Sequence, residues 1–278
     1  MSWLKNPVYK DHIRSVLYIW QGGMESGNAV ADVLSGKVSP SGKLTDTIAC
    51  SLADYPAAND FGDTVRNFYT EDIYVGYRYF ETIPGAAERV NYPFGFGLSY
   101  TDFEISNYRL VKISAEKISI SASVKNTGKV SGKEVVQVYA SLPGGTLEKE
   151  AHRLAAYAKT AELKPGETEE VTMEVTVDAL TSYDEESAAW ILEKGFYGIW
   201  IGNSLASAKL CGGMKLDATV TKRQVKNLFP LKQDLEEIVQ EPSRTAKRTE
   251  TAEKLAGEQA MTVLEPVSYT HLTLRRSY

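Results

Sequence analysis

The chain has 278 residues, of which 43% are hydrophobic and 24% are charged, and its formal net charge at pH 7 is −5. This composition is ordinary for a soluble globular protein, and the length predicts about two domains. The 31 lysines and arginines are scattered and are outnumbered by 36 acidic residues, which argues against nucleic acid or an anionic membrane as the main partner.

Neither the cysteines nor the histidines predict a metal or redox centre. Cys50 and Cys211 are far apart, and His12, His152 and His271 are equally dispersed. We therefore expect two ordinary buried thiols, no cofactor, and neither a zinc site nor a serine–histidine–aspartate triad. No run approaches the roughly 18 apolar residues of a membrane span. No signal peptide is visible, so the expected location is the cytoplasm, unless the true N-terminus is missing.

The first hundred residues predict one strand, one loop and one helix. Residues 16–20 (VLYIW) form a continuous apolar run that is typical of a strand buried on both faces. A glycine-containing loop over 21–27 leads to a helix expected over 28–35, which Gly36 should end in a left-handed conformation. Ligands bind outside the carboxyl ends of such strands, which makes Trp20 and Glu25 candidates for lining a substrate crevice.

The glycines of this loop match neither a dinucleotide fingerprint nor a P-loop, and tight backbone packing is the more common reason for them. Further on, residues 69–80 and 91–100 are dense in aromatic side chains. Such aromatics stack on sugars or, more often, pack between domains. Glu71, in the first of these stretches, is the third crevice candidate. A single strand and helix cannot bury both apolar faces, so residues 1–100 are predicted to be part of a larger α/β domain.

Beyond residue 105 the hydrophobic pattern changes to a period of two. Apolar and polar residues alternate over 118–125 and 171–177, and further strands are expected over 135–140 and, as a pair, over 189–192 and 196–201. Short alternating strands about ten residues apart predict an antiparallel β-sandwich, which we assign to residues 101–216.

The remaining residues divide into two stretches. Residues 217–266 predict a helical or linker segment: Leu228, Leu231, Leu235 and Ile238 lie at helical spacing, whereas residues 241–259 are polar, lack aromatics and suggest a linker. Residues 267–278 resemble a translated sequencing-adapter remnant, with a genuine tail as the alternative, and they are left out of the fold assignment.

Three stretches, in this order and spacing, resemble the family 3 glycoside hydrolases. They are residues 21–44 (QGGMESGNA through SPSGKL), 69–80 (YTEDIYVGYRYF) and 92–103 (YPFGFGLSYTDF). The resemblance covers about residues 13–215. Thr45 departs from it, because the family often has proline there, and so does Asp72, where glycine is common. Both departures resemble a bacterial subgroup.

The resemblance implies a specific architecture and chemistry. Such enzymes have a (β/α)8 barrel joined to an α/β sandwich, often followed by a fibronectin type III-like domain. An aspartate on the barrel forms the glycosyl intermediate and a glutamate on the sandwich protonates the leaving oxygen, with the two carboxyls about 5–5.5 Å apart. The barrel is absent from this chain, and the family's glutamate lies upstream of the loop at 21–27. No catalytic residue is therefore expected here, and Glu25 and Glu71 should shape the crevice or serve the structure.

The fold class is thus a partial α/β sandwich over 1–100, followed by an all-β immunoglobulin or fibronectin type III-like sandwich. The leading hypothesis is a fragment of a retaining β-glycosidase, inactive alone, whose partners are a small β-glucoside or oligosaccharide and the missing barrel of the same chain. The alternative is a free-standing β-sandwich interaction or carbohydrate-binding module, which has no need of an incomplete α/β segment. A cell-surface structural protein is less favoured, since repeats and sorting signals are missing. We also expect the barrel to follow this segment, in an inverted order; a C-terminal extension that only covers the sandwich is the alternative.

Overall fold

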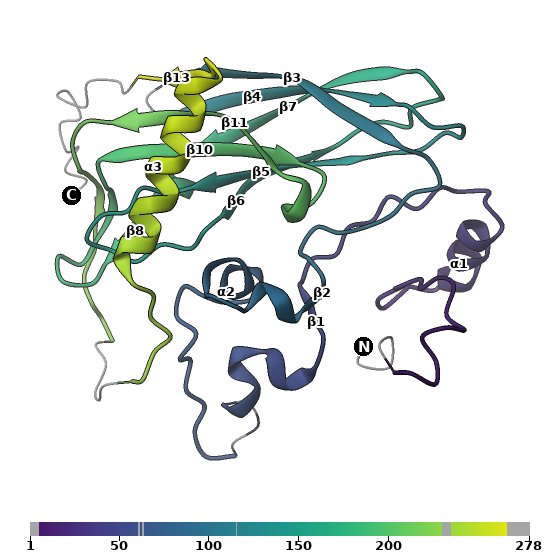
Figure 1. The fold of residues 1–278 in the computed structure, drawn as a ribbon, viewed down its shortest axis with the longest axis horizontal. Helices are drawn as coiled ribbons and strands as arrows, with labels where there is room; N and C mark the ends of the chain where they lie inside the picture. Colours follow the sequence, from purple (N-terminus) through teal and green to yellow (C-terminus); the bar gives the residue numbers. More distant parts are fainter. Residues whose placement is uncertain (1–5, 61, 63, 115, 230–234, 266–278) are drawn as a thin grey trace.

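The computed structural model describes residues 6–60, 62, 64–114, 116–229 and 235–265. Figure 1 shows a large β-rich body with a helix lying across it, and a smaller, irregular layer formed by the first hundred residues. The adapter-like stretch at 267–278 lies outside the described residues.

The predicted helix is present as α1 (Ser26–Leu34), close to the expected bounds. It ends at Ser35, and Gly36 follows with φ +77°, which confirms the left-handed residue after the helix. Glycine adopts this conformation without the steric penalty of a side chain.

The strand expected over residues 16–20 is wrong for this structure. These residues are coil, and their side chains are 41–54% exposed rather than buried. A strand needs a hydrogen-bonded neighbour, and none of the sheets in the described part of the chain contains this segment. The run therefore keeps its apolar character but has no layer to pack into.

The rest of the first hundred residues forms a small layer of short elements. Strands β1 (Ile48–Ala49) and β2 (Val90–Tyr92) pair antiparallel, and α2 (Tyr77–Thr82) packs beside them. Three 3-10 turns complete the layer: η2 (Leu52–Asp54), η3 (Pro56–Asn59) and η4 (Ala87–Arg89). The core of this layer is small and largely aromatic, consisting of Ala49, Tyr74, Tyr79, Phe80 and Ala86.

The β-rich body is a sandwich built from three sheets. A five-stranded sheet has the order β13-β11-β10-β5-β6, and two three-stranded sheets have the orders β3-β4-β7 and β12-β9-β8. One apolar cluster, with members from β4, β5, β7 and β10, fills the space between the strands. The bounds are β3 (Phe103–Lys112), β4 (Lys117–Asn126), β5 (Val135–Ser141), β6 (Arg153–Lys159), β7 (Thr168–Thr176), β8 (Ser182–Asp184), β9 (Ala189–Leu192), β10 (Gly195–Gly202), β11 (Lys209–Leu216), β12 (Val220–Gln224) and β13 (Thr262–Leu264), with 3-10 turns η5 (Val177–Leu180) and η6 (Leu205–Ser207).

The alternating pattern predicted β4 and β7 correctly, and β5, β9 and β10 form where further strands were expected. The expected pairing of 189–192 with 196–201 is wrong: β9 pairs with β8 and β12, while β10 pairs with β5 and β11. A period of two indicates which side of a strand is buried, but it does not indicate the neighbouring strand.

The C-terminal helix forms further along the chain than the leucine stripe predicted. Helix α3 spans Pro242–Glu258, inside the stretch expected to be a linker, whereas residues 235–241 are coil and Leu231 lies outside the described residues. Figure 1 shows α3 crossing β10 and β11. The helix is stable there because Ala252 and Ala256 are buried against Phe196 and Leu210.

Candidate functional site

Trp20 lies in the coil that precedes α1. Its backbone is left-handed, with φ +50°, and its side chain is 53% exposed. The indole ring meets the ring of Tyr18 edge to face, with the centroids 4.5 Å apart. A bulky residue rarely adopts this backbone conformation. Because more than half of its side chain is exposed, Trp20 faces solvent and does not end a buried strand.

Glu25 is the residue that precedes the first turn of α1. Its carboxylate accepts a 2.5 Å hydrogen bond from Asn28 Nδ2, and its main-chain carbonyl accepts the N–H of Ala29. A negative charge at a helix N-terminus also interacts favourably with the helix dipole. These contacts give Glu25 a local structural role at the start of α1.

Glu71 lies in the turn that leads toward α2. Burial, followed by the negative charge of Asp60, raises the pKa of its carboxyl. Asp60 is itself held by a 2.7 Å hydrogen bond from Thr70 Oγ1. Asp72, the next residue, has a left-handed backbone with φ +45°. Among the three candidates, Glu71 has the environment most like that of a functional carboxyl, because raised pKa values gather at such sites.

The structure does not bring the three candidates together. Trp20 and Glu25 adjoin α1, whereas Glu71 adjoins α2, and Figure 1 shows these two helices well apart. Glu25 and Glu71 therefore lie on separate elements of the structure.

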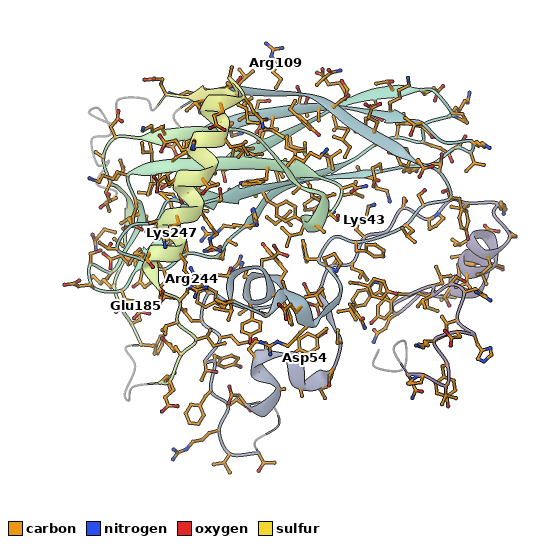
Figure 2. The ribbon with its side chains drawn as sticks, viewed as in Figure 1. Lys43, Asp54, Arg109, Glu185, Arg244 and Lys247 are labelled. Atoms are coloured by element: carbon orange, nitrogen blue, oxygen red, sulfur yellow. The ribbon has the colours of Figure 1, made fainter. Side chains whose placement is uncertain are left out.

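A polar joint connects the first hundred residues to the sandwich, and the sequence pattern did not indicate it. Lys43 Nζ lies 2.7 Å from Glu134 Oε1 and donates to the carbonyl of Gly97, and both charged side chains are almost fully buried. Figure 2 shows Lys43 where the N-terminal coil approaches the sandwich. The ion pair and its further hydrogen bond therefore link residues of the first hundred to the start of β5.

The loop between β5 and β6 forms the second half of this joint. Glu148 Oε2 accepts 2.6 Å and 3.2 Å hydrogen bonds from Tyr74 Oη and the Gln240 N–H. Glu150, which is fully buried, is bound by the guanidinium of Arg153, whose hydrogen bonds and charge outweigh burial and hold the pKa of Glu150 below its usual value. A run of charges after an apolar strand is the only sequence signal for this loop, and such a run usually marks a solvated surface.

His152 occupies an unusual position at the same joint. Its ring meets Trp200 edge to face at 4.9 Å, and Nδ1 lies 3.9 Å from Glu81 Oε2 without making a hydrogen bond. Burial, with the charge of Arg248 as a second cause, lowers the pKa of His152 to about 4. Burial also raises the pKa of Glu81. The imidazole is therefore neutral at pH 7.

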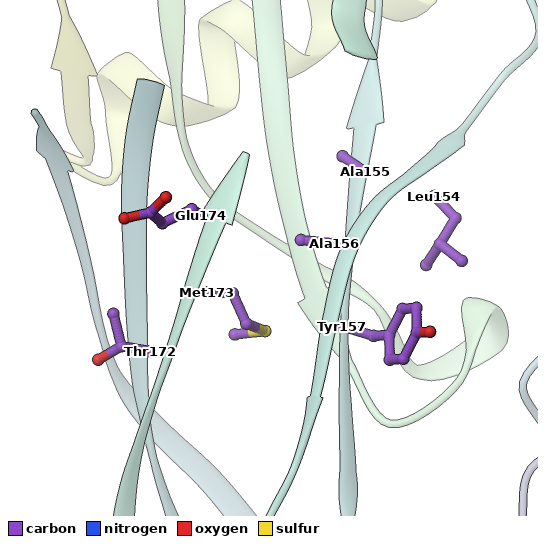
Figure 3. Close-up of a pocket in the computed structure, with 7 residues that line it drawn as sticks. All are labelled: Leu154, Ala155, Ala156, Tyr157, Thr172, Met173 and Glu174. Atoms are coloured by element: carbon purple, nitrogen blue, oxygen red, sulfur yellow. The ribbon is translucent and has the colours of Figure 1, made fainter. Parts of the chain in front are cut away.

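A shallow groove of about 420 Å³ lies along the edge of the sandwich between β6 and β7. Figure 3 shows the seven residues that line it: Leu154, Ala155, Ala156, Tyr157, Thr172, Met173 and Glu174. The Glu174 carboxylate is exposed and pairs with Lys117 at 2.8 Å. Since its one carboxylate is solvated and already paired, the groove has no arrangement suited to acid–base chemistry.

Within the described residues, no three or more His, Cys, Asp or Glu side chains gather as a metal site would require. In the same part of the chain, no helix combines the length and the apolar character needed to cross a membrane. Cys50 and Cys211 are half-buried rather than buried as expected, and burial raises the pKa of Cys211 to about 12.

Comparison with known families assigns both parts of the chain. Residues 1–100 match the glycosyl hydrolase family 3 C-terminal domain, and residues 134–205 match the fibronectin type III-like domain. The second match lies within the β-sandwich described above.

Individual relatives give the same result. The chain is 46% identical to β-glucosidase A of Butyrivibrio fibrisolvens over 81% of its own length and 29% of that protein, and 45% identical to a β-glucosidase of Ruminococcus albus over 76% and 22%. The crystal structure of a Paenibacillus barengoltzii β-glucosidase superimposes with a TM-score of 0.76 at 42% identity, covering 82% of this chain and 26% of that one. β-Glucosidase 3B from Thermotoga neapolitana, solved in complex with glucose, gives 0.70 at 38% identity, covering 77% and 30%.

The chain thus spans less than a third of the length of these relatives. At these identities the likeness reaches beyond the fold, and it includes both the small α/β layer and the sandwich. The chain belongs to glycosyl hydrolase family 3, of which it carries the C-terminal domain and the fibronectin type III-like domain.

Proposed function

We propose that this chain is a non-catalytic, structural part of a β-glucosidase. The whole enzyme hydrolyses terminal β-glucosides with retention of configuration. In this assignment the nucleophile and the acid/base carboxyl come from a barrel and from other segments of the enzyme outside this chain. The chain contributes one wall of the substrate crevice and holds that wall against the sandwich.

The observation that carries the proposal is the open apolar run at residues 16–20. These side chains are 41–54% exposed, although the run has the composition of a doubly buried strand. An apolar surface of this kind marks a contact with another protein layer. Because the run lies inside the region that matches the family 3 C-terminal domain, the missing layer is the remainder of that α/β domain.

The candidate residues have different roles in this assignment. Trp20 lies at the end of the open run and presents an aromatic ring that a sugar can stack on. The carboxyl of Glu71, whose pKa is raised, lines the crevice without acting as nucleophile or acid. Glu25 serves α1. The substrate class, a small β-glucoside or oligosaccharide, rests on the relatives, which are β-glucosidases.

A chimera tests the proposal. The matching region of β-glucosidase A from Butyrivibrio fibrisolvens is replaced by this chain, and hydrolysis of an aryl β-glucoside is measured. We expect the chimera to retain turnover within about tenfold of the parent. A matched chimera with Leu17→Asp and Ile19→Asp should lose turnover, because two charges cannot be buried in the restored layer without a large cost.

Sugar binding by the isolated chain tests the alternative function. A folded chimera without turnover, combined with binding of glucose or cellobiose by the isolated chain in calorimetry, would assign the chain as a carbohydrate-binding module instead. Turnover by the chimera and sugar binding by the isolated chain together distinguish a structural part of an enzyme from a free-standing module.

A further inference from the structure

Residues 235–265 form a segment that we name the C-terminal strap. It lies outside both regions matched by the family comparison, 1–100 and 134–205, and it contacts both parts of the chain. Figure 1 shows it rising from the small layer beside α2, crossing the sandwich as α3 and ending as β13. An element with contacts of this kind can couple the two parts mechanically.

The first contact of the strap is with the turn that carries Glu71. The N–H of Ile238 donates a 2.9 Å hydrogen bond to the carbonyl of Thr70. The side chain of Ile238 packs on the aromatic core of the small layer, which includes Tyr74. The neighbouring carboxyl of Glu237 lies close enough to Asp72 for that charge to act with burial in raising the pKa of Glu237.

The second contact joins the strap, the small layer and the sandwich at one carboxylate. Glu148, on the β5–β6 loop, accepts hydrogen bonds from both Tyr74 Oη and the N–H of Gln240. Gln240 is buried, and its side-chain amide, oriented to satisfy its neighbours, donates to the carbonyl of Thr82 at the end of α2. The strap is thus hydrogen-bonded directly to Thr70 and is linked to Tyr74 through the shared acceptor Glu148.

The rest of the strap is anchored on the sandwich. Ala252 and Ala256 of α3 are 3% and 1% exposed and pack on Phe196 and Leu210. After α3, β13 pairs in parallel with β11 and adds a fifth strand to that sheet. The anchor therefore contacts the sandwich twice, through the packing of α3 and the pairing of β13.

The turn at 70–74 contains a residue in an unfavourable backbone conformation. Asp72 occupies the left-handed region at φ +45°, which is unfavourable for a residue other than glycine. A strained backbone of this kind persists only where surrounding contacts hold it. The Tyr74 N–H donates to the carbonyl of Glu71 within the turn, and Ile73 and Tyr74 pack in the small aromatic core. The other contacts are those of Thr70 with Ile238 and with Asp60, and of Tyr74 with Glu148.

We propose that the C-terminal strap positions the turn at 70–74, and with it the Glu71 carboxyl, by tying that turn to the sandwich. Ile238 and Gln240 are the positioning residues, and α3 with β13 is the anchor. The partner of the strap is this turn of the same chain. The inference rests on contacts within the chain and stands whether or not the chain is part of a β-glucosidase.

Hydrogen–deuterium exchange on the full chain tests the proposal, with peptides that cover 69–76, 118–124 and 195–216. Ile238→Asp should increase exchange at 69–76 at least tenfold and leave the other two regions unchanged. The matched control is Val239→Asp: this adjacent side chain is 73% exposed, so the same charge should change nothing. Ile238→Val, which keeps the apolar contact, should behave as the parent chain does.

A second readout follows the position of the carboxyl itself. In a ¹³C NMR titration, the raised pKa of Glu71 should move toward the ordinary glutamate value in Ile238→Asp and stay raised in Val239→Asp and Ile238→Val. A role limited to overall stability would not change this titration in a chain that remains folded.

A remote variant keeps the test decisive if Ile238→Asp does not fold. Ala252→Asp undocks α3 far from the turn, and a continuous strap predicts faster exchange at 69–76 as well as at 195–216. Exchange at 69–76 that stays unchanged in either variant overturns the proposal. If exchange in Ile238→Asp rises equally at 118–124, that chain has unfolded globally and Ala252→Asp decides: faster exchange at 69–76 supports the proposal, and unchanged exchange there overturns it.

Discussion

The Tyr74 hydroxyl donates a 2.6 Å hydrogen bond to Glu148 Oε2, and so joins the core of the small layer to a loop of the sandwich. Tyr74 is completely buried, and burial together with this hydrogen bond raises the pKa of its phenol well above the usual range. The two residues are 74 positions apart in the sequence. The bond therefore depends on the packing of two domains and stabilises that packing in turn.

Removing this bond should destabilise the chain measurably. Tyr74→Phe keeps the ring in the core but leaves the carboxylate of Glu148 without its shortest hydrogen bond. We expect a loss of about 1.5–3 kcal/mol in the free energy of unfolding, the usual size for a bond to a charged group. Urea unfolding measures it. Tyr157→Phe is the control, since that side chain is 71% exposed and should change stability by less than about 0.5 kcal/mol.

The buried His152 predicts a dependence of stability on pH. Its pKa is about 4 in the folded chain, against 6.5 for a solvated imidazole, so the unfolded chain binds the extra proton first. Stability should be fully present above pH 6.5 and fall as the pH drops toward 4, by at most about 3 kcal/mol from this group. Glu81 opposes this trend, because its raised pKa adds stability at low pH and loses it as the pH rises.

Urea unfolding of the parent chain and of His152→Gln at pH 4.5, 5.5 and 7 separates the two contributions. The variant should show a flatter dependence between pH 4.5 and 6.5, because the group that unfolding protonates is gone. An equal slope in both proteins would mean that His152 is accessible and titrates normally in the folded chain.

Gly144 is expected to be needed for the docking of α3. A methyl group at this position would lie 2.5 Å from the main-chain nitrogen of Ala246, and backbone cannot move aside as a flexible side chain does. Gly144→Ala should therefore destabilise the chain by about 1–3 kcal/mol. In α1, a methyl group at Gly27 would meet nothing within 4 Å, and Gly27→Ala should be neutral or stabilising by about 0.5–1 kcal/mol. Matching losses for both variants would contradict the close approach at Gly144.

The isolated chain should not hydrolyse an aryl β-glucoside. Its candidate carboxyls, Glu25 and Glu71, adjoin different helices, α1 and α2, whereas retaining hydrolysis needs two carboxyls side by side. The measurement is release of the aryl alcohol by purified chain against a preparation from cells with an empty vector. Turnover above that background, and its loss on Glu71→Gln, would show that the chemistry resides in this chain after all.

Local sequence patterns predicted several strands and the end of one helix. The alternation at residues 118–125 and 171–177 predicted β4 and β7, because apolar and polar residues alternate in a strand that buries one face. Gly36 marked the end of α1 for an equally local reason. Strands β6 and β11 were not predicted, because alanines in one and glycines in the other hide the alternation.

The sequence predicted the candidate site only in part. Trp20, Glu25 and Glu71 were chosen from their positions relative to expected elements, and the structure places them at two separate locations. The sequence did not show that Lys43 and Glu134, or the charges of the loop around Glu148, would be buried, since charged residues usually mark solvated surface.

Periodicity therefore revealed which residues turn inward and where helices and strands begin, because those properties depend on neighbours within a few positions. Tertiary structure alone decided that β10 pairs with β5 and not with β9, and that residues 16–20 remain exposed. It also decided that α3 forms in the polar stretch at 242–258. Each outcome depends on a partner that lies far along the chain, or on the lack of one among the described residues, and no short window of sequence contains that partner.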